Sequence, residues 1–449
     1  MNVYRSFLFF VVLASGTALV TCSSPRRTSS DGDGDRAGNQ DRSKTAVSAL
    51  AFVNGKWFDG KAFVAGTRYV VGEVLRTTRP ASVATTIDLA GGYVVPPYGE
   101  GHTHLMEADK IDIYIQQYLD RGIFYAKDQS SALSIRRAIA GKVNRPASLD
   151  VVFANAGFTA PGGHPLQVIK QLEQLGALPA AASHDGDAVI VVRDASELAS
   201  KWDGFLAGKP DFVKVFLLYS EEYDKRKDDP EYEYRRGIDP ALVPAIVARA
   251  HRAGLSVSAH VYTASDFRSA VAAGVDEIAH LPGIGYDRNL GAEHFRLTDE
   301  DARQAGERHA RVVTTLTKIA EDAMSSAEVA RYFDDVVRGN LDKLRAAGVT
   351  ILIGADQFRR TSDVEISHLS RMGLFDNLAL LRAFSIDTPR AMFPGRRIGS
   401  LDDGYEASFL VLQGNPLDEP TNLLRIALRV KQGQIFLVEQ RMFPRDGDK

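Results

Sequence analysis

The chain has 449 residues, of which 45% are hydrophobic and 25% are charged, as in an ordinary globular protein. Its formal net charge of −3 gives no electrostatic reason to expect nucleic acid as a partner, and its single cysteine excludes an intramolecular disulfide and a Cys-x-x-Cys site. The length suits a barrel of about 250 to 300 residues with an accessory unit.

The first 22 residues have the pattern of an export signal. Arg5 provides a basic start, and residues 7–20 are an apolar stretch too short to span a bilayer. The segment "LVTC" resembles the lipobox of bacterial lipoproteins, with Thr21 in place of the usual small residue. This implies that residues 1–22 are a signal peptide, that Cys22 is lipidated and that the protein is anchored to a membrane, facing the periplasm. The alternative is an ordinary secretory signal and a soluble periplasmic protein.

Both ends of the remaining chain differ from its middle. Residues 23–46 are rich in Ser, Gly, Asp and Arg without an aliphatic cluster, so we predict a flexible linker. Residues 47–96 and 397–445 consist of short strand-like runs punctuated by Gly and Asp. They predict one small β-sandwich domain formed by both ends of the chain.

The middle, residues 97–396, alternates strand candidates with amphipathic stretches of helical period that often end on Gly. The strand candidates are residues 93–97, 122–128, 150–157, 211–218, 255–261, 276–282, 311–317 and 350–356. This alternation predicts an α/β fold, a closed (β/α)8 TIM barrel. Residues 188–194 are interpreted as an extra strand within a long connection. A doubly wound open sheet is the alternative, but no Gly-rich phosphate loop begins any of these helices.

Side chains that bind metals recur where the predicted strands end. His102 and His104 are one residue apart, so they point the same way in an extended chain. In a TIM barrel the side chains at the carboxyl ends of the strands converge on one site. This rule brings together His102, His104, Lys214, His260, His280 and Asp356. Imidazoles and carboxylates suit Zn²⁺ and other divalent metals, so the sequence predicts a metal site at this rim.

These motifs resemble the amidohydrolase superfamily of metal-dependent hydrolases, over about residues 47–440. The motifs are "HTH" on the first strand, "DFVKV" on the fourth, "SAH…AAGVDEIAH" across the fifth and sixth, and "IGAD" on the eighth. The tail "TPRAMFPGRRIGSLDDGYEASFLVLQGNPL" is similar to the return to the β-domain in the imidazolonepropionase-like and Xaa-Pro dipeptidase-like branch. Two positions depart from the family pattern, because Glu100 and Ser408 stand where Asp is usual.

The resemblance implies a hydrolase of carbon–nitrogen bonds in amides, cyclic amides or dipeptides, with two Zn²⁺ ions per chain. A carboxylated Lys214 would bridge the ions, and a desolvated site favours the neutral amine that can add CO₂. His102, His104 and Asp356 would hold the more buried ion, and His260 and His280 the other one. Asp356 would also accept and return the catalytic proton. A site with one metal, in which Lys214 is not a ligand, is the alternative.

Substrate contacts are expected from the loops that follow the strands. His164, in a glycine-rich segment, is a candidate for a hydrogen bond to substrate, with a surface histidine as the alternative, and Tyr219 and Tyr262 are weaker candidates. The expected partner is a small molecule, with no nucleic acid, membrane contact only through the lipid anchor and a homo-oligomer left open. The rival functions are a lactone or phosphotriester hydrolase and a non-catalytic metal-binding lipoprotein.

Overall fold

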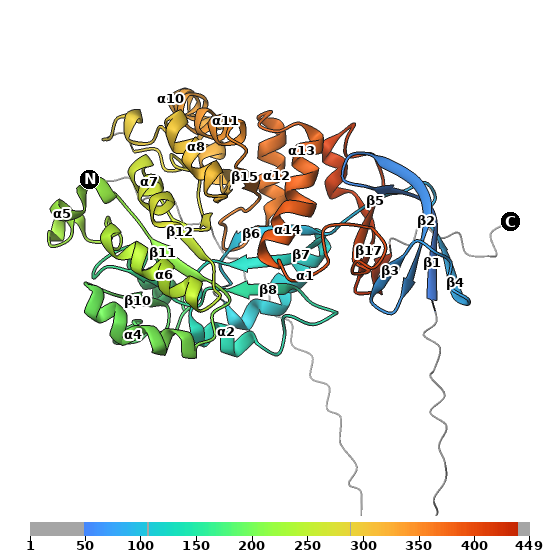
Figure 1. Cartoon of the computed structure of the whole chain (residues 1–449), viewed down its shortest axis with the longest axis horizontal. Coiled ribbons are helices and arrows are strands. Elements are labelled where there is room, and N and C mark those ends of the chain that lie inside the picture. The colour runs from blue at the N-terminus through green and yellow to red at the C-terminus, as the bar shows by residue number, and fades with distance from the viewer. Residues whose placement is uncertain (1–48, 106, 288, 439–449) are drawn as a thin grey trace, which may run out of the picture. The chain divides into compact units, whose positions relative to one another are not determined.

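The computed structural model describes residues 49–105, 107–287 and 289–438 (Figure 1). The predictions for the signal peptide, Cys22 and the linker lie outside these residues, as do residues 439–445 of the predicted β-domain. None of the helices in the described part of the chain is long and apolar enough to cross a bilayer.

Strands from both ends of the described chain form one β-sheet, in the order β18-β17-β16-β5-β1-β2-β3, with β4 paired to β1. These strands are β1 (Ala49–Phe58), β2 (Phe63–Val71), β3 (Val74–Arg76), β4 (Val83–Asp88), β5 (Tyr93–Val95), β16 (Phe409–Leu412), β17 (Ile426–Lys431) and β18 (Gln434–Val438). The antiparallel pairing of β16 with β5 joins the two ends of the chain. Strands from both ends of the chain thus share one sheet, as the sequence predicted, whereas their forming a separate β-domain stays a prediction.

This sheet has an apolar core of its own. The ring of Phe409 on β16 meets those of Phe52 and Trp57 on β1 at centroid distances of 4.9 and 5.4 Å, both edge to face. These residues belong to a buried cluster that is distinct from the main core. Each such aromatic pair contributes about 0.5–1.5 kcal/mol beyond the area it buries.

The middle of the chain contains parallel strands that follow one another in sequence order. They form a three-stranded sheet, β6-β7-β8, and a seven-stranded sheet, β10-β9-β11-β12-β13-β14-β15. The strands are β6 (Tyr98–Thr103), β7 (Ile123–Asp128), β8 (Asp150–Phe153), β9 (Gly157–Thr159), β10 (Val189–Val191), β11 (Val213–Phe216), β12 (Val257–His260), β13 (Glu277–Ile278), β14 (Arg311–Val313) and β15 (Thr350–Leu352). Backbone hydrogen bonds link the two sheets, from Gly101 to Ile353 O and from Asp211 to Phe153 O, each 2.8 Å long. This is the strand order predicted for the barrel.

Two strand predictions are wrong in extent. The run 93–97 ends as β5 in the β-domain, because the two prolines that follow lack the amide hydrogens to continue the ladder, and the first parallel strand is β6. Strand β6 has no apolar pattern in the sequence because it contains glycines. Close packing requires one of them, since a Cβ atom on Gly101 would lie only 2.9 Å from Ile353 O. The run 150–157 is divided between β8 and β9, and the extra strand at 188–194 is present as β10, at the edge of its sheet.

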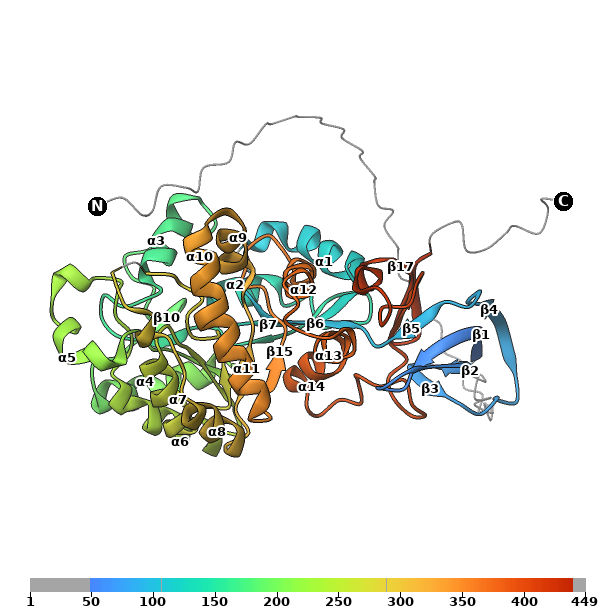
Figure 2. The ribbon, with the colours of Figure 1, turned by 90° about the horizontal axis from the view of Figure 1, so that it is seen from above.

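Helices follow most of the parallel strands and flank them, as Figure 2 shows. They are α1 (Ile111–Asp120), α2 (Leu133–Ile139), α3 (Leu166–Gln174), α4 (Ala195–Ala207), α5 (Tyr223–Arg226), α6 (Val243–Arg252), α7 (Ala264–Ala273), α8 (Asp299–Glu307), α9 (Thr317–Ser325), α10 (Ala327–Tyr332), α11 (Gly339–Ala346), α12 (Ser362–Arg371), α13 (Asn377–Arg382) and α14 (Thr388–Met392). The sequence sets several of their ends. Helix α7 starts at a capping box of Thr263 and Asp266 and stops at Gly274, whose φ of 83° favours glycine.

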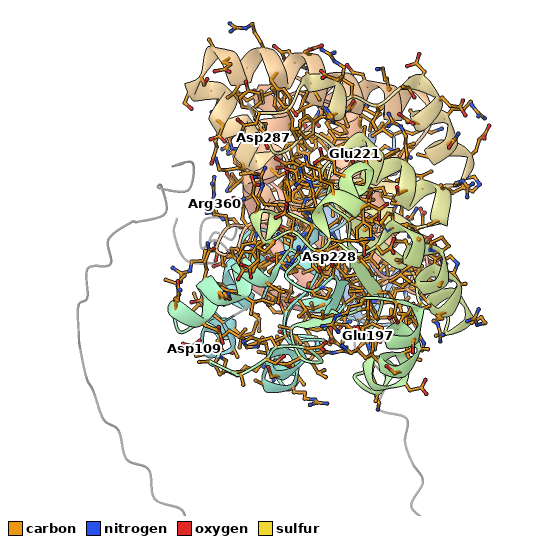
Figure 3. The ribbon with its side chains drawn as sticks, turned by 90° about the vertical axis from the view of Figure 1, so that its left-hand side faces the viewer. Asp109, Glu197, Glu221, Asp228, Asp287 and Arg360 are labelled. Atoms are coloured by element: carbon orange, nitrogen blue, oxygen red, sulfur yellow. The ribbon has the colours of Figure 1, made fainter. Side chains whose placement is uncertain are left out.

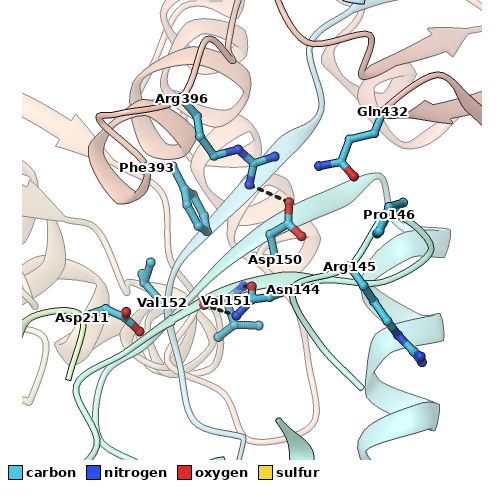
Figure 4. A pocket seen from close by; sticks show the side chains of 10 residues that line it. All are labelled: Asn144, Arg145, Pro146, Asp150, Val151, Val152, Asp211, Phe393, Arg396 and Gln432. Atoms are coloured by element: carbon cyan, nitrogen blue, oxygen red, sulfur yellow. Dashed lines mark hydrogen bonds and ion pairs between the residues drawn. The ribbon is translucent and has the colours of Figure 1, made fainter. Parts of the chain in front are cut away.

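A cluster of paired charges joins the β-domain to the start of β8, and Figure 4 shows the pair of Asp150 and Arg396 that belongs to it. Asp150 accepts hydrogen bonds of 2.7 Å from both Lys431 on β17 and Arg396. The second Nη of Arg396 donates to Glu406 at 2.6 Å. A cavity of about 470 Å³ lies beside this cluster, which we name the junction cluster (Asp150, Arg396, Glu406 and Lys431). Each of its charges has a partner of opposite sign.

Candidate metal centre

The structure brings the six predicted metal ligands together. They all line one cavity of about 190 Å³ at the carboxyl ends of the parallel strands. His102 comes from β6, Lys214 from β11 and His260 from the end of β12, whereas His280 and Asp356 follow β13 and β15. We name His102, His104, Lys214, His260, His280 and Asp356 the rim cluster.

Three members of the rim cluster bring their donor atoms within contact of one another. His102 Nε2 and His104 Nε2 are 3.3 Å apart, and Asp356 Oδ1 is 3.4 Å from the first and 3.2 Å from the second. Ligand atoms bound at about 2.0–2.1 Å to a tetrahedral zinc ion are themselves about 3.3–3.4 Å apart. The three donors therefore fit around one ion of this size.

His280 and His260 extend the cluster on the other side of Asp356. Asp356 Oδ2 is 3.8 Å from His280 Nδ1, and donor atoms of His102, His280 and Asp356 all lie within 4.8 Å of one another. The ring of His260 is 4.6 Å from that of His280. Asp356 thus directs one carboxylate oxygen toward each group of histidines.

Hydrogen bonding and burial prepare these histidines to bind metal. A carbonyl oxygen can only accept, so His102 Nδ1–H donates to Ala279 O at 2.9 Å and the neutral ring keeps a lone pair on Nε2. Burial disfavours the charged ring and holds the pKa of His102, His260 and His280 well below the usual value. The neutral imidazole is the form that coordinates a metal ion.

Asp356 is positioned by an unusual backbone conformation. Its φ of 50° lies in the left-handed region, which residues other than glycine seldom occupy, and its amide donates to His102 O at 2.9 Å. Burial raises the pKa of its carboxyl group, but the hydrogen bond from His104 and the electrostatic interactions with the neighbouring imidazoles and Lys214 outweigh this, so the pKa is lowered. Asp356 is therefore ionised at neutral pH.

Lys214 is completely buried, and burial lowers its pKa to about 7. Its Nζ donates to Gln129 Oε1 at 3.2 Å, and Gln129 Nε2 donates to Glu277 Oε1 at 2.9 Å. Glu277 also accepts from Lys127 Nζ at 2.8 Å, which completes a buried chain from one lysine to the other. The charge of Lys127 is thus already paired, and Lys214 retains a substantial fraction of neutral amine.

Glu100, one of the two departures from the family pattern, lies under the site. Its Oε1 accepts from the amides of His102 and Ala355, at 3.2 and 2.9 Å. Burial raises the pKa of this carboxyl group to about 8, despite those two hydrogen bonds. Glu100 therefore ties the strand that carries His102 to the segment that carries Asp356.

The three candidate substrate residues are placed differently from one another. His164 lines the cavity, and its ring stacks on that of His260 at 4.7 Å. Tyr219 and Tyr262 contact each other, with ring centroids 5.1 Å apart, and are not among the described residues that line the cavity. The substrate roles of all three stay predictions.

The sequence analysis did not find every residue that contacts the rim cluster. Gln129 follows β7, and Thr315, whose Oγ1 is 3.0 Å from His280 Nδ1, follows β14. The sequence holds a signal for both residues, because each lies near the carboxyl end of a predicted strand, the second or the seventh. The rule that side chains at the carboxyl ends of the strands converge therefore also includes them. The residues of α3 and Phe358, which also line the cavity, carried no such signal.

The fold is shared with hydrolases of known structure. An amidohydrolase is 21% identical, with a TM-score of 0.66 over 88% of this chain and 100% of its own. A. niger ochratoxinase is 16% identical, with a TM-score of 0.68 over 88% and 96%. A Xaa-Pro dipeptidase with methionine bound in its active site is 17% identical, with a TM-score of 0.66 over 87% and 100%. The amidohydrolase fold predicted from the motifs is confirmed.

At the level of sequence, no protein-family model matches this chain, and no curated protein matches it significantly.

Proposed function

We propose that the protein is a metal-dependent hydrolase of carbon–nitrogen bonds in amides, cyclic amides or dipeptides. The proposal includes a parallel sheet closed as a (β/α)8 barrel and a β-domain folded as a sandwich. The names of the similar structures, which include an amidohydrolase and a Xaa-Pro dipeptidase, support this class of reaction.

The donor set fits a divalent metal of the zinc class, because it combines neutral imidazoles with an ionised carboxylate. His102, His104 and Asp356 would hold one ion, and His260 and His280 a second one. Lys214, after its neutral amine has added CO₂, would present a carboxylate to both. Ions bound here supply Lewis acidity to a substrate carbonyl and to a water molecule.

Asp356 performs the proton transfers in this proposal. Its carboxylate is ionised, so it accepts a proton from the attacking water and later delivers it to the leaving nitrogen. Overall, OH from water joins the carbonyl carbon and H joins the nitrogen as the C–N bond breaks. The buried carbonyl of Ala279 holds the ring of His102 in place during these steps. His164, which lines the cavity, would hydrogen-bond the substrate in this proposal.

One observation carries the proposal: three donor atoms at 3.2–3.4 Å from one another, beside a completely buried lysine of lowered pKa. The test compares metal-free and zinc-loaded protein on libraries of N-acyl amino acids and dipeptides. We expect hydrolysis only with metal, and its loss in Asp356→Asn. Cleavage confined to lactones or phosphotriesters would favour the rival hydrolase, and zinc binding without turnover would favour the non-catalytic lipoprotein.

We also propose that the protein is exported and anchored through Cys22, which rests on the order of basic residue, apolar stretch and cysteine in the sequence. Mass spectrometry of the mature N-terminus tests this. An acylated Cys22 is expected, and an unmodified N-terminus beyond that residue would contradict it.

A further inference from the structure

The cavity of the rim cluster has one wall that is entirely apolar. Helix α3 contributes Val168, Ile169 and Leu172 to it, and Leu178 and Ala188 continue it. Ile169, Leu172 and Leu178 also belong to a buried cluster with residues of α2, which backs the wall from behind. This wall, Val168, Ile169, Leu172, Leu178 and Ala188, is named the α3 wall.

The α3 wall is held firmly at the start of its helix. Thr159 Oγ1 donates to His164 O at 2.6 Å, and the His164 amide donates to Arg236 O at 2.9 Å. Arg236 is itself nearly buried and donates to Pro161 O at 3.0 Å. The segment that leads into α3 is therefore fixed by β9 on one side and by the loop after β11 on the other.

Phe358, in the loop after β15, also lines the cavity. Its ring is 45% exposed and stands 5.6 Å from that of His104. The next residue, Arg359, donates to Glu107 through Nε and Nη2 at 3.2 and 3.0 Å, which ties the loop after β15 to the loop after β6. An aromatic ring beside His104 thus lines the same cavity as the α3 wall.

Among the described residues that line this cavity, titratable side chains occur only in the rim cluster and at His164. Figure 3 shows charged side chains on the face where the parallel strands end, among them Glu221, Asp287 and Arg360. Two of them have close partners, since Glu221 accepts from Thr263 Oγ1 at 3.0 Å and Arg360 pairs with Glu321 at 2.7 Å. Neither lines the cavity, so apart from the rim cluster and His164 no titratable group among its described lining residues is available to bind an ionic part of a ligand.

The size of the cavity sets the size of its ligand. A cavity of about 150 Å³ lined by Leu, Ile and Phe accepts a benzene molecule. The cavity here, about 190 Å³ with its metal-binding end included, is of similar size and has a comparable apolar wall. It accommodates the reacting bond and one apolar group about as large as a phenyl ring.

We propose that the α3 wall is a specificity pocket for a neutral apolar group, aromatic or branched aliphatic, attached next to the scissile C–N bond. The substrate class is then a small uncharged amide with such a group. This inference rests on the proposed function for the bond that is broken, but the pocket itself is a feature of α3 and binds without turnover.

The first test substitutes residues of one helix. Val168→Asp, at a half-buried position, should weaken binding of benzamide and acetanilide to the metal-free protein by about tenfold or more, the factor expected for burying a ring-sized apolar group. Leu172→Ala is the second variant, chosen to avoid a buried charge. The matched control is Leu175→Asp, because Leu175 is 77% exposed just beyond α3 and does not line the cavity. Binding is followed by ligand-observed NMR, and melting temperature reports folding.

The second test compares matched substrates on the zinc-loaded protein: acetanilide with 4-acetamidobenzoate, and benzamide with 4-carbamoylbenzoate. In at least one pair the neutral compound should have a kcat/KM about tenfold or more above its carboxylate. Equal rates within both pairs, or equal effects of Val168→Asp and Leu175→Asp on binding, would overturn the pocket. Absence of hydrolysis with unchanged binding differences would instead reject the proposed function and leave the pocket standing.

Discussion

The two ends of the parallel strands carry charged clusters of opposite character. In the junction cluster, Asp150 binds Lys431 and Arg396, and Arg396 also binds Glu406, so that two acids balance two bases. In the rim cluster, Asp356 faces His102 and His280, whose burial keeps their imidazole rings neutral. The junction cavity is the larger, about 470 Å³ against about 190 Å³. The feature that distinguishes the junction cluster from the rim cluster is the pairing of its charges, and not the size of the cavity beside it.

The difference has a physical meaning. A buried charge that has a partner stabilises the arrangement around it, and losing one partner costs about 3–5 kcal/mol. Buried neutral imidazoles carry no charge to be paired, so they gain little stability from contacts with one another. We infer that the junction cluster acts on stability and that the rim cluster acts on chemistry.

The largest effect is expected for Lys214→Ala, which removes the carboxylate proposed to join two ions. Loss of an ion costs several kcal/mol of transition-state stabilisation, about a thousandfold in rate. Added short carboxylic acids should restore part of the activity, because the missing group is a carboxylate on a long arm. A lysine needed only for its positive charge would show no such rescue.

The comparison between the two clusters predicts opposite effects for two Asp→Asn variants: one should lose activity and keep its stability, and the other should lose stability and keep its activity. Asp356→Asn should lower kcat by about 10²- to 10⁴-fold, the contribution of a positioned proton-transfer group. Its stability should change by less than about 1 kcal/mol, because functional sites are seldom optimised for stability. Denaturant unfolding and steady-state kinetics measure both effects.

Asp150→Asn should do the reverse, with a loss of about 3–5 kcal/mol of stability. Asp150 is the first residue of β8, whereas the rim cluster lies at the carboxyl ends of the parallel strands. The molecules that remain folded should therefore keep the kcat of the wild-type protein. An Asp150 variant that is fully stable yet inactive would contradict the division of roles.

A smaller effect is expected for Gln129→Leu, which removes the acceptor of Lys214 and the donor to Glu277. Residues that orient a metal ligand typically change metal affinity by about 10- to 100-fold. Zinc titration against a competing chelator measures this. Gln116→Leu, an exposed change on α1, is the control and should leave the affinity unchanged.

The sequence predicted the fold and the rim cluster because both follow from a repeated pattern. Strands alternating with helices give the order of the parallel strands, and His102, His260, His280 and Asp356 all occur where such strands end. Strand β6 was missed because Gly99 and Gly101, which allow close packing against neighbours, remove its apolar pattern. A buried strand that contains several glycines can therefore lack the apolar pattern by which strands are predicted.

The contacts between distant segments could not be predicted in the same way. Gln129 reaches Lys214 over 85 residues, and Glu100 reaches Ala355 over 255. The α3 wall arises because one face of an ordinary amphipathic helix lies over the cavity, and nothing in its periodicity says which face this is. Such relations depend on tertiary packing and became visible only in the folded chain.

The central claim is that the rim cluster binds the catalytic metal, and elemental analysis tests it most directly. After saturation with zinc and removal of the excess, the wild-type protein should retain two ions per chain. A variant with both His102→Asn and His104→Asn should lose at least one of them. His251→Asn, at an exposed histidine on α6, is the matched control and should retain both. A wild-type protein that retains no zinc, or a double variant that retains as much as the wild type, would contradict the account.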